Sequence, residues 1–88
     1  MIEIVYTSQF KKDVKQLKKR GMKIPKLENI VTLLCLQRKL PPRCRPHKLH
    51  GDYNGFWECH IEPDWLLIYH QEETCIVLTR TGTHSDLF

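Results

Sequence analysis

The chain has no long hydrophobic run, and this absence limits where it can act. Its longest uninterrupted apolar stretch is residues 65–69, whereas a helix needs about 20 apolar residues to span a bilayer. Residues 1–6 do not combine a charged start with an apolar segment, so they do not resemble a secretion leader. We therefore expect a cytoplasmic protein with no membrane partner.

The chain also lacks any Cys-x-x-Cys pair among its 4 cysteines, which are Cys35, Cys44, Cys59 and Cys75. Without an export signal, we expect these thiols to be reduced rather than joined in two disulfides. Histidine, cysteine and carboxylate side chains are good zinc ligands, but no recurrent ligand spacing is present. We expect no metal and no cofactor, and a zinc site is the alternative.

Positive charge is scarce in the carboxyl-terminal part of the chain, and histidine is absent before residue 47. Residues 1–48 hold 13 of the 14 Lys and Arg residues, and residues 49–88 hold Arg80 alone against seven acidic residues. All 5 histidines lie between His47 and His84. A cationic surface attracts a polyanion, and imidazoles beside carboxylates transfer protons near neutral pH. This layout favours a small nuclease.

The first half has helical periodicity after a short strand. Alternating apolar residues over 2–7 predict the strand, and Ser8 stands where a helix N-cap belongs. The apolar spacing of Phe10, Val14 and Leu17 predicts a helix that Gly21 ends. Pro25 suits the first turn of a second helix. The apolar face of that second helix is Leu27, Ile30, Val31, Leu34 and Cys35, and Pro41, Pro42 and Pro46 prevent its continuation.

The second half reads as β structure. We expect a short extended piece at 47–50 and strands at 56–61, 65–69 and 75–79, the second of these strands central because it is apolar on both faces. The predicted order is β-α-α-β-β-β in one domain, residues 1–88. This is an α+β fold in which two helices pack on one face of a mainly antiparallel sheet. The order of the strands in that sheet is not set by the sequence.

Several ionisable side chains lie at the ends of these predicted strands. Glu58 and His60 share one face of a strand, Asp64 follows its end, His47 precedes it, and His84 follows the last strand. Metal-free RNA cleavage needs a base for the 2′-OH and an acid for the leaving 5′ oxygen. Imidazole serves either step because its pKa is about 6.5. These five residues are the catalytic candidates, and ordinary surface histidines are the alternative.

Other charged and aromatic side chains are candidates for binding RNA. Arg80 is placed to clamp a phosphate, or else to pair with a nearby acid, and Phe88 is placed to stack on a base or to be a plain apolar terminus. His50 points away from His47 in an extended chain, so at most one of the two joins the site, and His70 is expected to face solvent. The first helix carries a lysine face that either binds a polyanion or is simply solvated, formed by Lys11, Lys12, Lys15, Lys18 and Lys19.

The chain also resembles a known family. The motifs are His47-Lys-Leu-His-Gly51, Trp57-Glu-Cys-His-Ile-Glu-Pro-Asp-Trp-Leu-Leu-Ile-Tyr69 and Leu78-Thr-Arg-Thr-Gly-Thr-His-Ser-Asp-Leu-Phe88. Together with Tyr6-Thr-Ser-Gln-Phe-Lys-Lys-Asp and the helical pair, they resemble the YafQ-type branch of the RelE-like bacterial toxins over nearly the whole chain. The resemblance implies a compact sheet flanked by two helices.

The resemblance implies a function as well. Such toxins belong to type II toxin–antitoxin systems and cut mRNA in the ribosomal A site without metal. By this resemblance, the catalytic positions of the family correspond to His47, His60, Asp64 and His84. Phe88 matches a terminal aromatic residue that contributes to activity in the family. Glu58 stands where aspartate is common, which makes its role less secure. A cognate antitoxin, the 70S ribosome with its rRNA, and mRNA are the implied partners. A gyrase poison of related fold and a non-catalytic RNA-binding module are the rivals.

Overall fold

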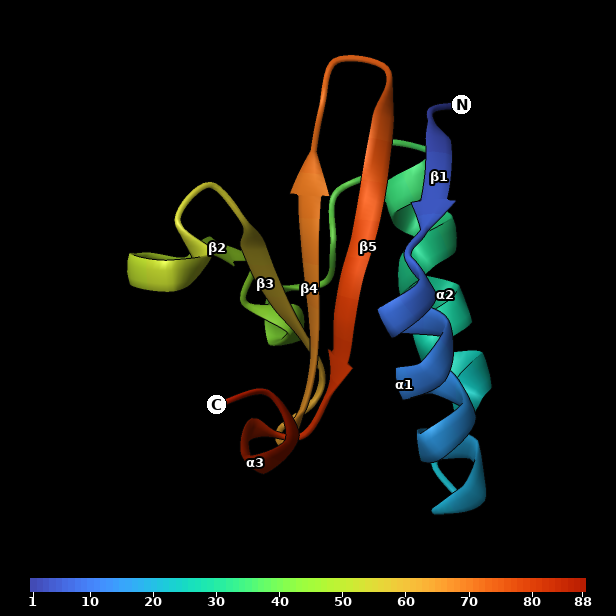
Figure 1. Cartoon of the computed structure of the whole chain (residues 1–88). Helices are drawn as coiled ribbons and strands as arrows, with labels where there is room; N and C mark the ends of the chain where they lie inside the picture. Colours follow the sequence, from blue (N-terminus) through green and yellow to red (C-terminus); the bar gives the residue numbers. More distant parts are fainter.

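The computed structural model describes all 88 residues as a five-stranded sheet with two helices on one face (Figure 1). The strands are β1 (Glu3–Tyr6), β2 (His47–Lys48), β3 (Trp57–Glu62), β4 (Trp65–Gln71) and β5 (Cys75–Gly82). The helices are α1 (Ser8–Lys19), α2 (Ile24–Cys35) and α3 (His84–Leu87), and two 3₁₀ turns are η1 (Pro42–Cys44) and η2 (Gly51–Tyr53). No helix is long and apolar enough to cross a membrane.

The strand order is β1-β5-β4-β3-β2. β1 runs parallel to β5, and every other neighbouring pair is antiparallel. The predicted α+β fold with a mainly antiparallel sheet is therefore confirmed, and β4 is the middle strand. Its alternate residues Trp65 and Leu67 join the main core, while Leu66 and Ile68 join a smaller core on the opposite face.

The main core lies between the sheet and the helices α1 and α2. The first helix contributes Phe10 and Leu17, which are almost fully buried. The second helix contributes Leu27, Ile30 and Leu34, as its apolar spacing predicted. Burial of side chains of this size is the dominant favourable contribution to folding, at roughly 1.5–3 kcal/mol for each one fully buried. The opposite face of the sheet is left largely free of helices, and the candidate site lies there.

The start of α1 differs from the prediction. The N-cap is Thr7 and not Ser8, because the hydroxyl of Thr7 accepts a hydrogen bond from the Phe10 N–H at 3.0 Å. Thr7 is preferred since its hydroxyl also lies 3.1 Å from the Leu78 carbonyl oxygen of β5, to which it can donate. The helix ends at Lys19, and Gly21 follows the C-cap Arg20 with a left-handed φ of +80°, as predicted for a C′ residue.

The carboxyl-terminal part of the chain contains more regular structure than the sequence indicated. β4 continues to Gln71, so His70 lies in a strand and packs against Phe56, with ring centroids 5.2 Å apart. β5 continues to Gly82, and the next residues form α3. A capping box creates this helix: the Thr83 hydroxyl accepts from the Asp86 N–H, and the Asp86 carboxylate accepts from the Thr83 N–H at 2.9 Å.

All four cysteines are free thiols. Cys44 and Cys59 are fully buried in the main core, where burial raises the pKa of Cys59 to about 12. A thiol with so high a pKa is not ionised near neutral pH, so Cys59 is a packing residue and not a nucleophile.

Candidate active site

Strand pairing brings the candidate catalytic side chains together from four segments. In the β2–β3 ladder His47 is directly opposite Glu58. Glu58 and His60 are two positions apart in β3, so their side chains project from the same face of the strand. Asp64 lies in the turn between β3 and β4, and His84 begins α3 just after β5. Because β3, β4 and β5 are neighbours, that turn and the end of β5 lie at one end of the sheet (Figure 1).

Glu58 is the buried centre of the first half of this cluster. Its side chain is 8% exposed, and its Oε1 atom lies 3.3 Å from Nε2 of His47 and 3.8 Å from Nε2 of His60. A carboxylate buried to this degree needs donors or cations to compensate for lost hydration. The two imidazoles compensate for that loss when they are protonated at Nε2, and Glu58 thus links two side chains from different strands.

One ring nitrogen of His47 is held by a backbone carbonyl, which determines the tautomer of the ring. Its Nδ1 atom lies 2.8 Å from the carbonyl oxygen of Arg45. A carbonyl only accepts hydrogen bonds, so Nδ1 carries the proton, and Nε2 is the atom that gains or loses one. Arg45 has a left-handed φ of +44°, which side-chain-bearing residues rarely adopt. No sequence pattern indicates this backbone contact.

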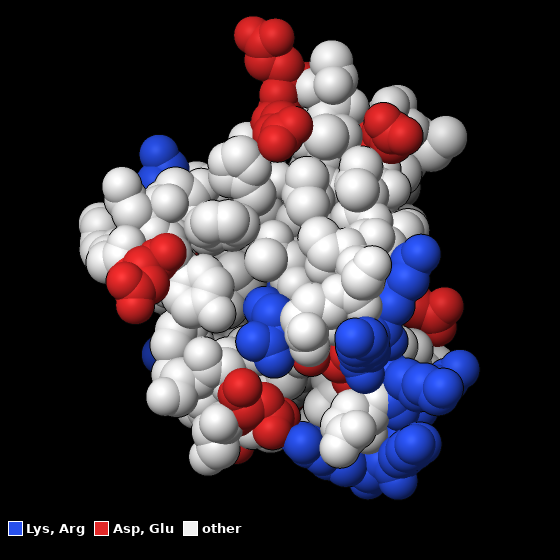
Figure 2. All heavy atoms as spheres, in the orientation of Figure 1, with Lys and Arg blue, Asp and Glu red and all other residues white.

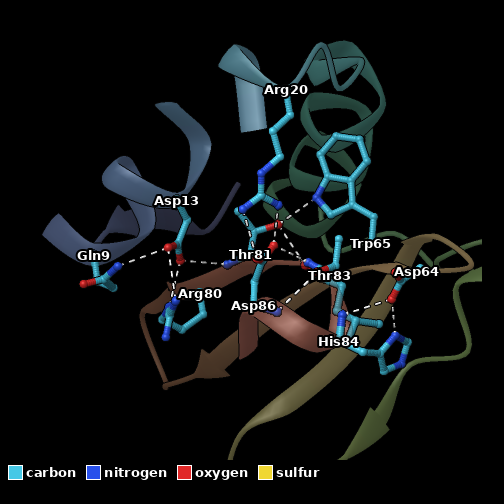
Figure 3. Close-up of polar contacts among 11 residues, drawn as sticks. Gln9, Asp13, Arg20, Asp64, Trp65, Arg80, Thr81, Thr83, His84 and Asp86 are labelled. Atoms are coloured by element: carbon cyan, nitrogen blue, oxygen red, sulfur yellow. Dashed lines mark hydrogen bonds and ion pairs between the residues drawn. The ribbon is translucent and has the colours of Figure 1, made fainter. Parts of the chain in front are cut away.

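His84 is held by Asp64 at two points. Oδ1 of Asp64 lies 2.5 Å from Nδ1 of His84 and accepts the His84 backbone N–H at 3.0 Å (Figure 3). These hydrogen bonds, the backbone one first, lower the pKa of Asp64. Because Nδ1 faces a carboxylate, Nε2 of His84 is left to exchange a proton. The ring of His84 is 6.1 Å from that of His60, centroid to centroid, so the two halves of the cluster meet.

Arg80 pairs with an acidic residue that sequence reasoning did not consider. Asp13 of α1 accepts from Arg80 Nε at 2.8 Å and Nη2 at 3.2 Å, and from the Thr81 backbone N–H at 3.1 Å (Figure 3). β1 pairs with β5 only over residues 75–78. Asp13 therefore takes the place of a strand partner at the uncovered edge of β5. Asp13 is the main cause of the raised pKa of Arg80.

The remaining candidates and their charged neighbours lie outside this cluster. Phe88 is 65% exposed, and its ring packs edge-on to Tyr53. His50 is exposed, and Glu62, next to Pro63, pairs with Lys26 of α2 at 3.1 Å. No group of three or more His, Cys, Asp or Glu side chains is arranged to hold a metal ion. The five lysines of α1 are all exposed: Lys11, Lys12, Lys15, Lys18 and Lys19.

Charge is unevenly distributed over the surface. In the view of Figure 2, Lys and Arg side chains gather over the α1 side of the molecule, and acidic side chains lie mainly at the opposite end and toward the other edge. The exposed lysines of α1 and Arg20, just beyond its end, belong to this basic surface. The candidate catalytic cluster lies on the face of the sheet opposite α1 and α2, away from this basic surface.

Two residues near the site were missed by sequence reasoning. Arg20 and Asp86 form a two-point hydrogen-bonded ion pair next to His84, with distances of 2.7 Å and 3.0 Å (Figure 3). The Thr83-x-x-Asp86 spacing is a capping signal that points to a short helix after Gly82. No comparable signal links Arg20 to Asp86, because the two are 66 positions apart.

Comparison with known proteins identifies the family. Residues 2–88 match the model of the family described as "Bacterial toxin of type II toxin-antitoxin system, YafQ". The mRNA interferase toxin YafQ of Escherichia coli K12 is 40% identical over 98% of this chain and 95% of its own length. The fold and the sequence thus define a small RelE-like bacterial toxin.

Solved structures agree with this assignment. YafQ in the E. coli DinJ–YafQ toxin–antitoxin complex superposes with a TM-score of 0.91 at 40% identity, covering 99% of this chain and 97% of that one. A metal-bound toxin from Helicobacter pylori superposes with a TM-score of 0.92 at 38% identity over 100% of both chains. The chain belongs to the YafQ family of toxins of type II toxin–antitoxin systems, which confirms the resemblance seen in the sequence.

Proposed function

We propose that this toxin is a ribosome-dependent endoribonuclease that cuts mRNA in the A site by metal-independent acid–base catalysis. The observation that carries the proposal is the row of three imidazoles linked by two carboxylates, running from His47 through Glu58 and His60 to His84 and Asp64. The enzyme class agrees with the name of the E. coli relatives, mRNA interferase toxin.

The reaction assigned to this cluster is attack of a ribose 2′-OH on the adjacent phosphate. His60 positions and activates the nucleophile, and His47 and His84 supply the general acid and stabilise charge. Asp64 contributes through its hydrogen bond to His84, which fixes the tautomer of that ring. The 2′-oxygen bonds to phosphorus, its proton passes to one imidazole, and a second imidazole protonates the departing 5′ oxygen.

Arg80 is assigned to the phosphate. Its guanidinium is held by Asp13, so it is fixed in direction before substrate arrives. A group that is preorganised in this way stabilises developing negative charge without a further ordering cost. The ion pair with Asp13 also offsets the charge of Arg80. Arg80 therefore acts through the guanidinium N–H groups that do not bond to Asp13.

The basic surface of α1 is assigned to ribosomal RNA. Exposed lysines bind phosphates without regard to sequence, and such binding weakens steeply as salt rises. The antitoxin is the second expected partner, since an E. coli relative was solved in the DinJ–YafQ complex. An acidic antitoxin that covers the basic surface or the histidine cluster would keep the toxin inactive until the antitoxin is removed.

Translating ribosomes and purified toxin test the proposal directly. New 5′ ends should be produced in ribosome-bound message, not in free message, and they should persist in the presence of a chelator. His60→Ala and His84→Ala should each abolish most of the cleavage. His70→Ala is a matched control, because it removes an imidazole that lies outside the cluster and packs against Phe56.

Three results would contradict the proposal. Unchanged cleavage in both His60→Ala and His84→Ala would show that the cluster is not catalytic. Ribosome binding without new RNA ends would favour the RNA-binding module. DNA damage on induced expression, with translation initially continuing, would favour a gyrase poison.

A further inference from the structure

A basic hollow lies at the outer edge of β3, beside one of the candidate catalytic imidazoles. Its volume is about 510 Å³, and its walls include Lys26, Arg43, Arg45, His60 and Glu62. β2 pairs with β3 only along the first two residues of β3, so the rest of that edge has no neighbouring strand. The η1 turn packs against β3 (Figure 1). The hollow thus occupies a stretch of the sheet edge that no strand covers.

Two arginines line the hollow from a loop whose backbone is restrained. Cys44 lies between them and is fully buried, whereas Arg43 and Arg45 are exposed. Prolines at positions 41, 42 and 46 fix φ on both sides of this segment. Neither guanidinium makes a hydrogen bond or an ion pair within the protein, although both side chains line the same hollow. Their donors are therefore available to a ligand, and the loop that carries them is already ordered.

The charge of the hollow favours an anion. Lys26 pairs with Glu62, which is the only acidic residue in the walls, so three cations stand against one carboxylate. Like charges that share a hollow repel one another, and an anion placed among them removes that repulsion. A guanidinium also donates two parallel hydrogen bonds to a phosphate, which makes arginine well suited to this ligand. The chemistry of the walls therefore fits a phosphate group.

The hollow is connected to the candidate catalytic cluster at two places. His60 forms part of its wall, and Nε2 of that ring lies 3.8 Å from Glu58. The backbone carbonyl of Arg45 accepts a hydrogen bond from Nδ1 of His47 at 2.8 Å. The residue whose side chain lines the hollow thus also orients a second imidazole. A phosphate held in the hollow is next to the linkage on which these imidazoles act.

We propose that this hollow binds an RNA phosphate that neighbours the scissile linkage, through Arg43 and Arg45. The inference rests on the proposed endoribonuclease function and adds an anchoring point for the message that is separate from Arg80 and from the lysines of α1. An anchor beside the cut limits the movement of the reacting phosphate. An acidic antitoxin segment would meet the same cations, and RNA is preferred because a candidate catalytic imidazole forms one wall.

A message with one methylphosphonate linkage tests the contact directly. A methyl group there replaces a charged phosphate oxygen, and a 2′-O-methyl group on the adjoining ribose keeps that linkage intact. On ribosomes at limiting concentration, the substitution at one of the two linkages that flank the cut should slow wild-type toxin about tenfold. The Arg43→Gln, Arg45→Gln double variant should be about tenfold slower on the unmodified message and little slower again on the modified one.

Two results of this experiment would overturn the inference. Wild-type toxin could cut the methylphosphonate messages as fast as matched messages that carry only the 2′-O-methyl group, which would mean that no flanking phosphate is bound. The double variant could instead lose as much rate on the modified message as wild type does. Independent losses of that kind would mean that the phosphate is held elsewhere.

Two control variants separate the hollow from general attraction to RNA. Arg38→Gln removes an exposed arginine beyond the other end of α2, outside the hollow, and should cut at the wild-type rate. Lys15→Gln removes one charge from the basic surface of α1 and should keep the full effect of the methylphosphonate. Loss of that effect in either variant would contradict a contact that is specific to the hollow.

Removal of the one acid in the hollow should have the opposite effect. Glu62→Gln leaves the three cations unopposed, so it should cut about two- to fivefold faster at limiting ribosome. Glu73→Gln makes the same change of net charge on the exposed β4–β5 hairpin and should not change the rate. Equal acceleration in both variants would mean that only the total charge of the protein matters.

A binding measurement distinguishes failure of the hollow from failure of the proposed function. If wild-type toxin leaves all messages intact, the endoribonuclease proposal fails, and NMR titration judges the hollow. A 2′-O-methyl trinucleotide should shift the Nε–H signals of Arg43 and Arg45, and its methylphosphonate form should not. Signals that respond to neither compound, or equally to both, would rule out a phosphate contact. Wild-type cutting by the double variant, with weaker binding of purified antitoxin, would assign the hollow to the antitoxin and overturn the inference.

Discussion

Arg20 and Asp86 join the end of α1 to α3, the short helix that begins at His84. Nη1 and Nη2 of Arg20 donate to the two carboxylate oxygens of Asp86 at 2.7 Å and 3.0 Å. Asp86 is also the N3 residue of the α3 capping box, so one carboxylate serves both contacts. A Cβ atom at Gly82 would lie 2.9 Å from the Cβ of Asp86, which explains why this position needs glycine. Arg20 thereby becomes a positioning residue for His84.

Arg20→Ala should lower the rate of cleavage, because α3 loses the contact that anchors it to α1. A misplacement of about 1 Å can cost on the order of a hundredfold in rate, so a tenfold fall in kcat is a reasonable expectation here. Single-turnover cleavage on saturating ribosomes measures this quantity. Lys19→Ala is the control, since it removes a neighbouring exposed cation that forms no ion pair within the protein.

Asp86→Ala distinguishes positioning from simple attraction to RNA. If only surface charge mattered, removal of an acid would strengthen ribosome binding and speed cleavage at limiting ribosome. Positioning predicts slower cleavage, and it predicts that the Arg20→Ala, Asp86→Ala double variant loses little more than one single variant. Multiplicative losses in the double variant would mean that Arg20 acts independently of Asp86.

Acid should destabilise the protein through Asp64 and Asp86. The pKa of each is lowered in the folded state, that of Asp86 mainly by Arg20 and that of Asp64 mainly by the His84 backbone N–H. A lowered pKa in the folded state gives stability that is present above the unfolded pKa of about 3.9 and lost as pH falls below it. Thermal melts should therefore show a falling Tm below about pH 4.

Asp86→Asn should show a shallower fall of Tm over the same acid range, because the titrating carboxylate is gone. Asp52→Asn is the matched control, since Asp52 is exposed and makes no ion pair. The effect is modest for partly exposed carboxylates. Equal slopes of Tm against pH for wild type, Asp86→Asn and Asp52→Asn would contradict the prediction.

The elements that depend on local signals were predictable, and those that depend on distant contacts were not. The apolar spacing from Phe10 to Leu17 and the two-faced apolar segment in β4 follow from periodicity, so the helices and the central strand were found. The alternation in β3 likewise placed Glu58 and His60 on one face. These inferences need only neighbours in sequence.

The site depended more on contacts between distant segments. The pairing of Asp13 with Arg80, and of Arg20 with Asp86, joins residues more than sixty positions apart, where no local pattern operates. In sequence, Asp64 directly follows the strand that carries His60, whereas in the structure its carboxylate contacts His84. The choice between these partners depends on where β5 ends relative to the β3–β4 turn, which requires the strand order.

Thr81→Val should destabilise the whole fold, because Thr81 satisfies two buried polar groups. Its hydroxyl accepts from the indole N–H of Trp65 at 2.9 Å and donates to the Leu66 carbonyl at 2.8 Å. Valine has nearly the same shape but no hydrogen-bonding group, so the buried indole N–H loses its partner. Such a loss costs about 1–3 kcal/mol in the free energy of unfolding, measured by urea denaturation.

Thr79→Val is the matched control for that measurement. Thr79 is a partly buried threonine on the same strand, and its hydroxyl donates only to Val77 at a long 3.4 Å. Thr79→Val therefore removes only a weak hydrogen bond, and the higher β propensity of valine offsets part of the lost stability. Similar midpoints for Thr79→Val and Thr81→Val would mean that the Trp65–Thr81 hydrogen bond does not stabilise the sheet.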